Sequence, residues 1–175
     1  MKTDMNGCDN SPLLAYEAAL EQLTRGIGPS GGVIDTPLRQ ALGAVLAKSI
    51  DAEIDVPGCA MSAMDGYAIN TTDLAASGPT SLTLSQRIPA GTFGEPLAPG
   101  TAARIFTGAP VPDGADAVIM QEQVESDDHQ VNFEARPEVG SNIRPAGNDI
   151  QRGTTILSAG CRLRAQDIGL AASVG

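Results

Sequence analysis

Three segments of this sequence carry side chains whose chemistry suits a charged ligand: 62–69, 104–112 and 142–150. The groups of interest in them are Ser62, Asp65, Thr107, Gly108, Arg144 and Asp149. Carboxylates hold Mg²⁺ through oxygen, and a guanidinium binds phosphate or another oxyanion through paired hydrogen bonds. A hydroxyl beside a glycine amide can also donate to an anion. Together these groups suit a metal-bridged anionic ligand, and they suit acyl or hydride transfer poorly.

Each segment also has a purely structural interpretation. Asp65 stands before Gly66, which can adopt a positive φ, and the pair is typical of a turn in which the aspartate caps its own backbone before a strand. Thr107 follows an apolar stretch and begins a proline-containing turn. An Arg144–Asp149 contact would simply hold its loop closed and, if exposed, would add little to stability.

Familiar catalytic patterns are missing from the sequence. The single histidine, His129, falls in a predicted hairpin tip, and no ordered set of nucleophile, histidine and carboxylate surrounds it. There is no GxSxG, HExxH or phosphate-binding glycine loop. Cys8, Cys59 and Cys161 form no CxxC pair, which predicts reduced thiols and no structural zinc site.

Charge and hydropathy exclude two classes of partner. The formal net charge is −10, and no basic patch is present, so nucleic acid is not expected to bind. No apolar run approaches the roughly 18 residues that a membrane span requires. The polar segment 1–11 lacks the apolar stretch of a secretion signal, which favours a cytoplasmic protein.

The elements that must position the candidate residues follow from apolar spacing. Ser11-Pro12 is a favoured helix start, and an apolar stripe follows it. That stripe consists of Leu13, Tyr16, Leu20 and Leu23. Residues 33–35 suggest a short strand. Thr36-Pro37 begins a second predicted helix, in which Gly43 is a weak point. The apolar face of this second helix comprises Leu38, Leu42, Val45 and Leu46.

A β pattern follows between about residues 60 and 151. Short apolar or alternating runs separated by Gly, Pro and Asp predict strands at 82–84, 103–106, 117–120 and 131–135. Residues 127–129 form the predicted tip of a hairpin between 121–125 and 131–135. The run 117–120 is apolar throughout, as in a strand that is covered on both faces. A further strand is expected at 155–157, and the stretch 165–174 is apolar.

The domain organisation predicted from these patterns is a β block inserted into a smaller mixed domain. The fold class is therefore α+β, mostly β. Residues 1–11 are an expected disordered tail, and the chain ends directly after an apolar stretch, which suggests that further domains follow.

The three segments resemble the molybdopterin molybdenumtransferase family of the MoeA type, to which the gephyrin and plant cofactor-assembly E domains are related. The resemblance rests on five segments in the family's order and spacing, namely 62–68, 104–112, 118–122, 142–150 and 168–175. It covers the chain from about residue 12 to its end.

The resemblance implies an elongated homodimer of four-domain subunits, of which this chain would hold the first two domains. Residues 33–51 and 153–175 would form the elongated, discontinuous first domain, and 52–152 the β-rich second domain. The leading helix and loop, 12–32, would pack on the third domain, which binds the pterin substrate and lies outside this chain.

The chemistry implied by the resemblance is insertion of molybdenum into a pterin cofactor. Enzymes of the family take molybdate and adenylylated molybdopterin, which a molybdopterin adenylyltransferase supplies. They cleave the adenylate with Mg²⁺, release AMP and leave molybdenum on the dithiolene. This chain alone is expected to be inactive, because the substrate-binding domain is not in it.

The active-site cleft of the family lies between the third domain of one subunit and the second domain of its partner. By resemblance, the catalytic residues on this chain's wall of the cleft are Asp65, Thr107 and Asp149, and the first and last of these are weak candidate Mg²⁺ ligands. The substrate-binding residues implied in the same way are Ser62, Gly108 and Arg144.

Two departures from the family's pattern stand beside these residues. The family has an aromatic residue and Asp-Asn before its Ser-Ala-Met-Asp segment, where this chain has Cys59-Ala60-Met61. It also has Glu before the aspartate of the third segment, where this chain has Asn148. An alternative function is therefore a non-catalytic scaffold or assembly module of the same fold.

Overall fold

The computed structural model describes residues 14–28 and 31–175, and its secondary structure is mostly β with few helices, as the sequence predicts. The chain divides between Thr36 and Pro37 into two compact units. Across the described residues, no helix is long and apolar enough to cross a membrane. Cys59 and Cys161 are free thiols, and Cys8 lies outside the described residues.

In the first unit, helix α1 spans Tyr16–Thr24. The predicted start at Ser11-Pro12 lies outside the described residues. The apolar stripe of α1 is exposed, with Tyr16 76% and Leu23 75% accessible. A helix of this length is marginal in water by itself. Docking of α1 on a third domain therefore stays a prediction, and the exposed stripe is the reason to expect such a partner.

Two predicted elements between residues 33 and 46 are wrong. Residues 33–35 form no strand, and the second helix is reduced to the short 3₁₀ turn η1, Leu38–Gln40. Gly43 adopts φ +80°, and its amide donates to the carbonyl of Leu163 at 2.8 Å. Val45 then forms a β-bridge with Arg162. Long-range pairing with the segment around residue 162 thus outcompetes the local helical pattern.

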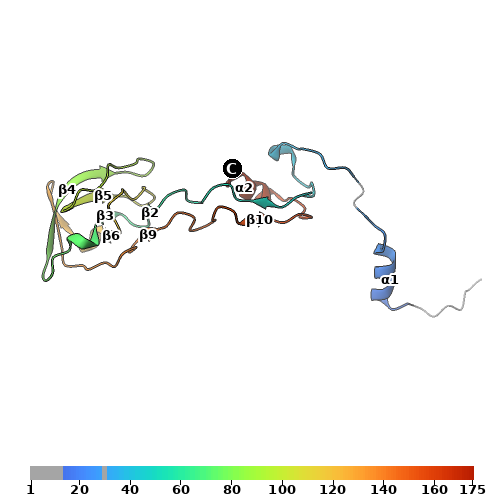
Figure 1. Cartoon of the computed structure of the whole chain (residues 1–175), viewed down its shortest axis with the longest axis horizontal. Helices are drawn as coiled ribbons and strands as arrows, with labels where there is room; N and C mark the ends of the chain where they lie inside the picture. Colours follow the sequence, from blue (N-terminus) through green and yellow to red (C-terminus); the bar gives the residue numbers. More distant parts are fainter. Residues whose placement is uncertain (1–13, 29–30) are drawn as a thin grey trace, which may run out of the picture. The chain divides into compact units, whose positions relative to one another are not determined.

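A small sheet joins the two ends of the second unit. Strand β1, Ile50–Asp51, pairs antiparallel with β10, Thr155–Leu157. Helix α2, Ala165–Ala172, lies beside β10, as Figure 1 shows, and fills the apolar stretch predicted at the end of the chain. The buried core of this region consists of Ala41, Leu157, Leu163 and Ala171. The exact domain boundaries proposed from the sequence stay a prediction.

The β block is built on a six-stranded sheet in the order β6-β3-β5-β4-β8-β7. Its strands are β3 (Gly66–Ile69), β4 (Thr80–Ile88), β5 (Thr101–Ile105), β6 (Ala117–Met120), β7 (Glu125–Ser126) and β8 (Gln130–Phe133). Strands β4 and β5 are parallel, and the other neighbours are antiparallel. Figure 1 shows β3, β5 and β6 gathered side by side.

The sheet is covered by apolar side chains on both faces. Tyr67 and Ile69 belong to one buried cluster, whereas Ala68 between them belongs to another, as the alternation of a strand requires. β6 is buried along nearly its whole length, which confirms the continuous apolar run predicted there. The predicted hairpin tip at 127–129 is also present, between β7 and β8.

The short 3₁₀ turns of the β block are η2, Thr71–Asp73, and η3, Gln121–Gln123. The second of these corrects the prediction of a strand at 121–125, of which β7 is the paired part. The amide of Gln121 donates to the carbonyl of Asp65 at 3.0 Å, and the chain then turns into η3. The chain therefore leaves β6 at the point where it meets the first candidate segment.

Candidate functional site

Backbone pairing brings the three candidate segments together. Strand β2, Met61–Ser62, pairs antiparallel with β9, Ile143–Arg144, and places Ser62 beside Ile143. Met61 also forms a bridge with Pro110. Segments that are about 80 residues apart in sequence thus share one short ladder, which Figure 1 shows as β2 beside β9.

Ser62 is a structural centre of this ladder. It is 1% exposed, and its carbonyl accepts from the amide of Gly108 at 2.9 Å. Its amide donates to the carbonyl of Ala109 at 2.9 Å, and its hydroxyl donates to the carbonyl of Met64 at 2.6 Å. The hydroxyl predicted to bind substrate is therefore already engaged in holding the turn before Asp65.

Asp65 is held by Thr107. Its Oδ1 accepts from the backbone amide of Thr107 at 2.8 Å and from the Thr107 hydroxyl at 2.7 Å. The backbone hydrogen bond, then the hydroxyl, lowers the pKa of Asp65 below its usual value, and the charge of Arg104 acts in the same direction. The prediction that Asp65 caps its own backbone is thus wrong, since its partner lies 42 residues away.

Glycine is required at position 66 for a reason other than the expected positive φ. Gly66 is absent from the positive-φ positions and lies within β3, where a Cβ atom would stand 1.9 Å from the carbonyl oxygen of Ile119. The expected positive φ occurs at Gly108, with φ +79°, in the turn that presents Thr107. Close approach of two strands therefore demands glycine at position 66.

Arg144 and Asp149 form a second pair. One terminal nitrogen of Arg144 donates to both oxygens of Asp149, at 2.9 and 2.7 Å, with both side chains about half exposed (47% and 48%). The Asn148 amide donates to the same carboxylate at 3.0 Å. The Asn148 hydrogen bond first, and Arg144 second, lower the pKa of Asp149. The contact proposed as the structural interpretation of this loop is therefore present.

Four of the six predicted residues form two side-chain pairs, Asp65–Thr107 and Arg144–Asp149, and Ser62 and Gly108 belong to the backbone framework that carries them. Within the described residues, no hydrogen bond or ion pair joins the Asp65–Thr107 pair to the Arg144–Asp149 pair. Convergence of the two pairs on one ligand stays a prediction.

Arg104 is a supporting residue that the sequence interpretation did not assign. It donates to the carbonyl of Gly66 at 2.9 Å and to the side chain of Gln121. Its guanidinium also lies over the rings of Tyr67, at 5.2 Å, and Phe106, at 4.5 Å. An arginine inside an otherwise apolar strand is the signal that could have identified it, because such a residue must be paired or stacked.

A complete metal site is not present in the described part of the chain, where no three His, Cys, Asp or Glu side chains gather closely enough to hold a metal ion. Both oxygens of Asp149 are engaged with Arg144. Asp65, with its second oxygen outside the Thr107 hydrogen bonds, remains able to supply one ligand. Mg²⁺ commonly uses only one or two protein carboxylates when phosphates and waters complete its shell.

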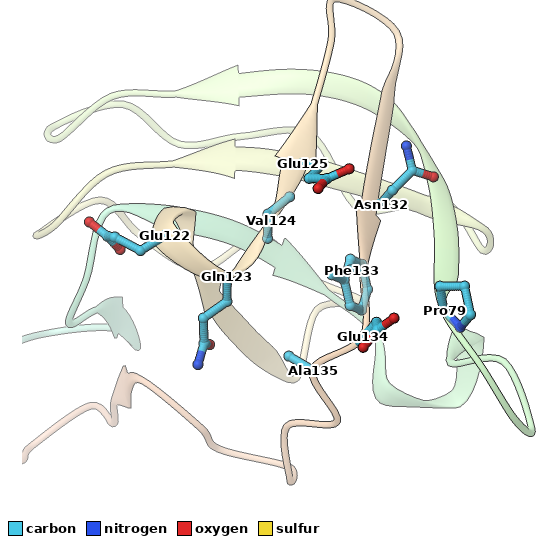
Figure 2. Close-up of a pocket in the computed structure, with 9 residues that line it drawn as sticks. All are labelled: Pro79, Glu122, Gln123, Val124, Glu125, Asn132, Phe133, Glu134 and Ala135. Atoms are coloured by element: carbon cyan, nitrogen blue, oxygen red, sulfur yellow. The ribbon is translucent and has the colours of Figure 1, made fainter.

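An open pocket of about 840 Å³ lies elsewhere, along η3, β7 and β8. Figure 2 shows carboxylates on Glu122, Glu125 and Glu134 among its lining residues, together with the buried Phe133. No arginine or lysine lines this pocket. Its charge disfavours an anionic ligand, and it contains none of the predicted site residues.

Comparison with known proteins identifies the relatives of this chain. Residues 14–175 match the family described as the MoeA N-terminal region (domain I and II). A molybdopterin molybdenumtransferase of Haemophilus influenzae is 39% identical over 142 residues, covering 79% of this chain and 34% of that protein. Molybdopterin molybdenumtransferase 2 of Mycobacterium tuberculosis is 38% identical over 164 residues, covering 91% of this chain and 40% of that protein.

A solved structure is similar over the same region. The crystal structure of a molybdopterin biosynthesis moeA protein from Pyrococcus horikoshii OT3 matches with a TM-score of 0.83 at 35% identity, covering 94% of this chain and 44% of that chain. This chain therefore spans well under half the length of the relatives that it matches.

Proposed function

This chain belongs to the family of the MoeA N-terminal region, and we propose that it is the dimerising and cleft-completing part of a molybdopterin molybdenumtransferase. The complete enzyme would accept adenylylated molybdopterin from a molybdopterin adenylyltransferase, insert molybdenum from molybdate and release AMP. In this proposal the chain by itself is inactive, because the relatives extend well beyond the region that it covers.

The observation that carries the proposal is the geometry of Asp65. Neutral donors from Thr107 keep this carboxylate ionised and fix one of its oxygens. An ionised oxygen on a rigid turn is suited to a cationic centre or to a proton of the reacting ligand. The backbone framework that positions Asp65 also contains the other two candidate segments.

Mg²⁺ fits this arrangement only as an ion shared with the substrate. Asp65 would supply a single oxygen ligand, and the ligand's phosphates and waters would supply the rest. When bound, the ion would offset the negative charge of the leaving phosphate. The task of this chain's residues is then to keep Asp65 ionised and oriented.

Arg144 is suited to hold the anionic substrate next to that carboxylate. One of its terminal nitrogens is engaged with Asp149, and its other N–H groups make no hydrogen bond with a described residue. Asp149 thereby orients the guanidinium fork, and the free donors can reach a phosphate oxygen.

A homodimer is part of the same proposal. Leu42 and Val45 are 65% and 62% exposed in the region around β1 and β10, although they are apolar. Burial of such side chains against a second copy would supply the free energy of association. Light scattering should report a dimer that Val45→Glu converts to monomer, whereas Val139→Glu, at another exposed valine, should leave it unchanged.

The test of the proposed function is the Asp65→Asn variant in a full-length enzyme that carries this region. Asparagine can still accept from Thr107, so the turn should remain folded, but the negative charge is lost. We expect release of AMP from adenylylated molybdopterin to fall by roughly a hundredfold in kcat/KM, with little change in Tm. Asp113→Asn, at an exposed aspartate, is the matched control. Equal activity of the two variants would return Asp65 to a structural role.

A scaffold function is the second candidate, and one observation favours it. Asn148 donates an amide hydrogen bond to Asp149. A carboxylate at position 148 would add negative charge beside Asp149 and favour a metal ion, whereas the neutral amide does not. If the full-length protein dimerises but inserts no molybdenum under conditions in which a relative does, the scaffold interpretation replaces the enzyme.

A further inference from the structure

Arg87 has no assigned role, yet the structure places it in an unusual position. In the parallel pair of β4 and β5 it stands directly beside Arg104. Its guanidinium lies 4.5 Å from the centre of the Phe106 ring, the same distance as that of Arg104. Two like charges on neighbouring strands ordinarily repel each other. An aromatic ring can stack with both guanidinium groups, and a bound anion would offset their repulsion.

An irregularity in β4 produces this juxtaposition. Before it, Leu84 is the partner of Ala102, and after it Gln86 is the partner of Ala103, so that Ser85 is an extra residue. A one-residue slip exchanges the two faces of a strand. Leu82 accordingly packs in the cluster that contains Tyr67, whereas Ile88 packs in the cluster of the opposite face.

Without the extra residue, Arg87 would lie beside Ile105 and Gln86 beside Arg104. The bulge therefore turns Arg87 toward the face on which Arg104 and Phe106 stand, and bulges that re-aim a side chain are frequent near active sites. Here the re-aimed side chain lies in β4 beside Arg104, which is three positions before Thr107 in the sequence.

The two arginines differ in how their donors are used. Arg104 is engaged with the Gly66 carbonyl and the Gln121 side chain. The side chain of Arg87 makes no hydrogen bond or ion pair with any other described residue, in a chain that has 21 acidic and 11 basic side chains. Its guanidinium is held by stacking while its donors remain open to a ligand.

We propose that Arg87, stacked with Arg104 on Phe106, binds a tetrahedral oxyanion beside the Asp65–Thr107 turn. This inference rests on the proposed function, in which the reacting ligands are anionic, and it adds a positioning residue for them. The shared chemistry is a group with at least two negative charges, either a phosphoryl group of the substrate or molybdate itself. A planar guanidinium suits such a group because two parallel N–H donors match two of its oxygens.

The direct test is an NMR titration of the 175-residue chain, observing the arginine side-chain Nε–H signals at constant ionic strength. One arm adds inorganic pyrophosphate and the other adds molybdate. We expect saturable shifts of the Arg87 and Arg104 signals, and an affinity that falls about tenfold in Arg87→Gln, as for loss of one charged hydrogen-bond pair. The arm with the tighter binding identifies the source of the oxyanion.

Two further variants distinguish specific binding of the oxyanion by Arg87 from a general effect of positive charge. Arg136→Gln removes the same charge at an exposed arginine in the segment after β8 and should leave the affinity unchanged. Arg87→Lys keeps the charge but loses the planar fork, so it should bind nearly as weakly as Arg87→Gln. Shifts that grow without saturation at all arginines, or equal losses in Arg87→Gln and Arg136→Gln, would overturn the proposal.

Steady-state kinetics of a full-length enzyme distinguish a failure of this inference from a failure of the proposed function. There Arg87→Gln should raise KM for the anionic substrate about tenfold, with kcat changed much less. Saturable binding by Arg87 in a protein that inserts no molybdenum would support this site and contradict the proposed function. An active Arg87→Gln enzyme with an unchanged KM would support the proposed function and contradict this site.

Discussion

The two aspartates of the candidate site are held in opposite ways. Asp65 accepts hydrogen bonds from neutral donors of Thr107, so its negative charge is oriented but not cancelled. Asp149 faces the guanidinium of Arg144, and the pair is nearly neutral as a whole. The difference indicates separate tasks: Asp65 is suited to a cation or a proton, whereas Asp149 is suited to orienting an arginine. Under the proposed function, a negatively charged substrate would use both.

The two pairs also differ in what supports them. Asp65 directly precedes a strand of the six-stranded sheet, and Thr107 follows its neighbour β5. Arg144 ends the two-residue strand β9, and Asp149 lies in the loop beyond it. A substitution that disturbs the sheet should therefore displace Asp65 most. A substitution in the loop should change only the Arg144–Asp149 pair.

Gly66→Ala should have the largest effect, because it disturbs the support of Asp65. The added Cβ would meet the Ile119 carbonyl at 1.9 Å, so two strand backbones would have to separate. We expect a loss of about 3 kcal/mol or more in the free energy of unfolding, measured by urea denaturation. Gly58→Ala is the control, since its nearest neighbour atom lies 3.9 Å away. Equal stability of the two variants would show that β3 and β6 are not so closely packed.

Thr107→Val should have an intermediate effect, confined to the charge of Asp65. It removes the hydroxyl and keeps the backbone amide, so the lowered pKa of Asp65 should rise part of the way to its ordinary value. Carboxyl ¹³C NMR measures this pKa directly. Thr107→Ser, which retains a hydroxyl, should restore most of the shift; an unchanged pKa in Thr107→Val would contradict the assigned hydrogen bond.

The loss of stability in Thr107→Val should depend on pH. Because the pKa of Asp65 is lowered on folding, its contribution to stability is present above the unfolded-state pKa and is lost as the pH falls through the folded-state pKa. The stability difference between wild type and Thr107→Val should therefore be present at neutral pH and vanish in acid, below the ordinary aspartate range. A difference of equal size at both pH values would indicate lost packing instead of lost charge stabilisation.

Arg144→Gln should have the smallest effect on stability. Its ion pair with Asp149 is half exposed, so the Tm should fall by no more than about 2 °C. The pKa of Asp149 should rise while Asn148 continues to lower it. Arg152→Gln, at an exposed arginine outside the ion pairs, is the control. A large loss of Tm in Arg144→Gln would mean that the loop is part of the fold's core.

Much of the fold could be predicted because its signals are local. The apolar run 117–120 and the alternation around Val131 identify β6 and β8, and the polar residues 127–129 identify the hairpin tip between β7 and β8. The helix predicted after Thr36 failed for the opposite reason. Gly43 donates to the carbonyl of Leu163, 120 positions along the chain, and no local pattern contains that partner.

Among the contacts of the candidate residues, the Arg144–Asp149 pair could be predicted from the sequence, but the Asp65–Thr107 pair could not. The three segments could be named from their chemistry and from a family resemblance, yet the partner of Asp65 lies 42 residues away. Arg87 was missed because its position depends on a bulge near Ser85, and register is invisible in a single sequence. The close approach that requires Gly66 is likewise a property of two strands and not of one.

The central claim is that Asp65 and its neighbours complete a cleft whose other wall belongs to a second subunit. A mixing experiment tests it most directly: full-length Asp65→Asn enzyme, which we expect to be strongly impaired by itself, is combined with the wild-type 175-residue chain under conditions that exchange subunits. The account predicts that molybdenum insertion returns in the mixed dimer, because the intact wall of the short chain faces the substrate domain of its partner, and that a short chain carrying Asp65→Asn restores nothing. Mixed dimers that form but remain inactive with the wild-type chain would contradict the shared cleft.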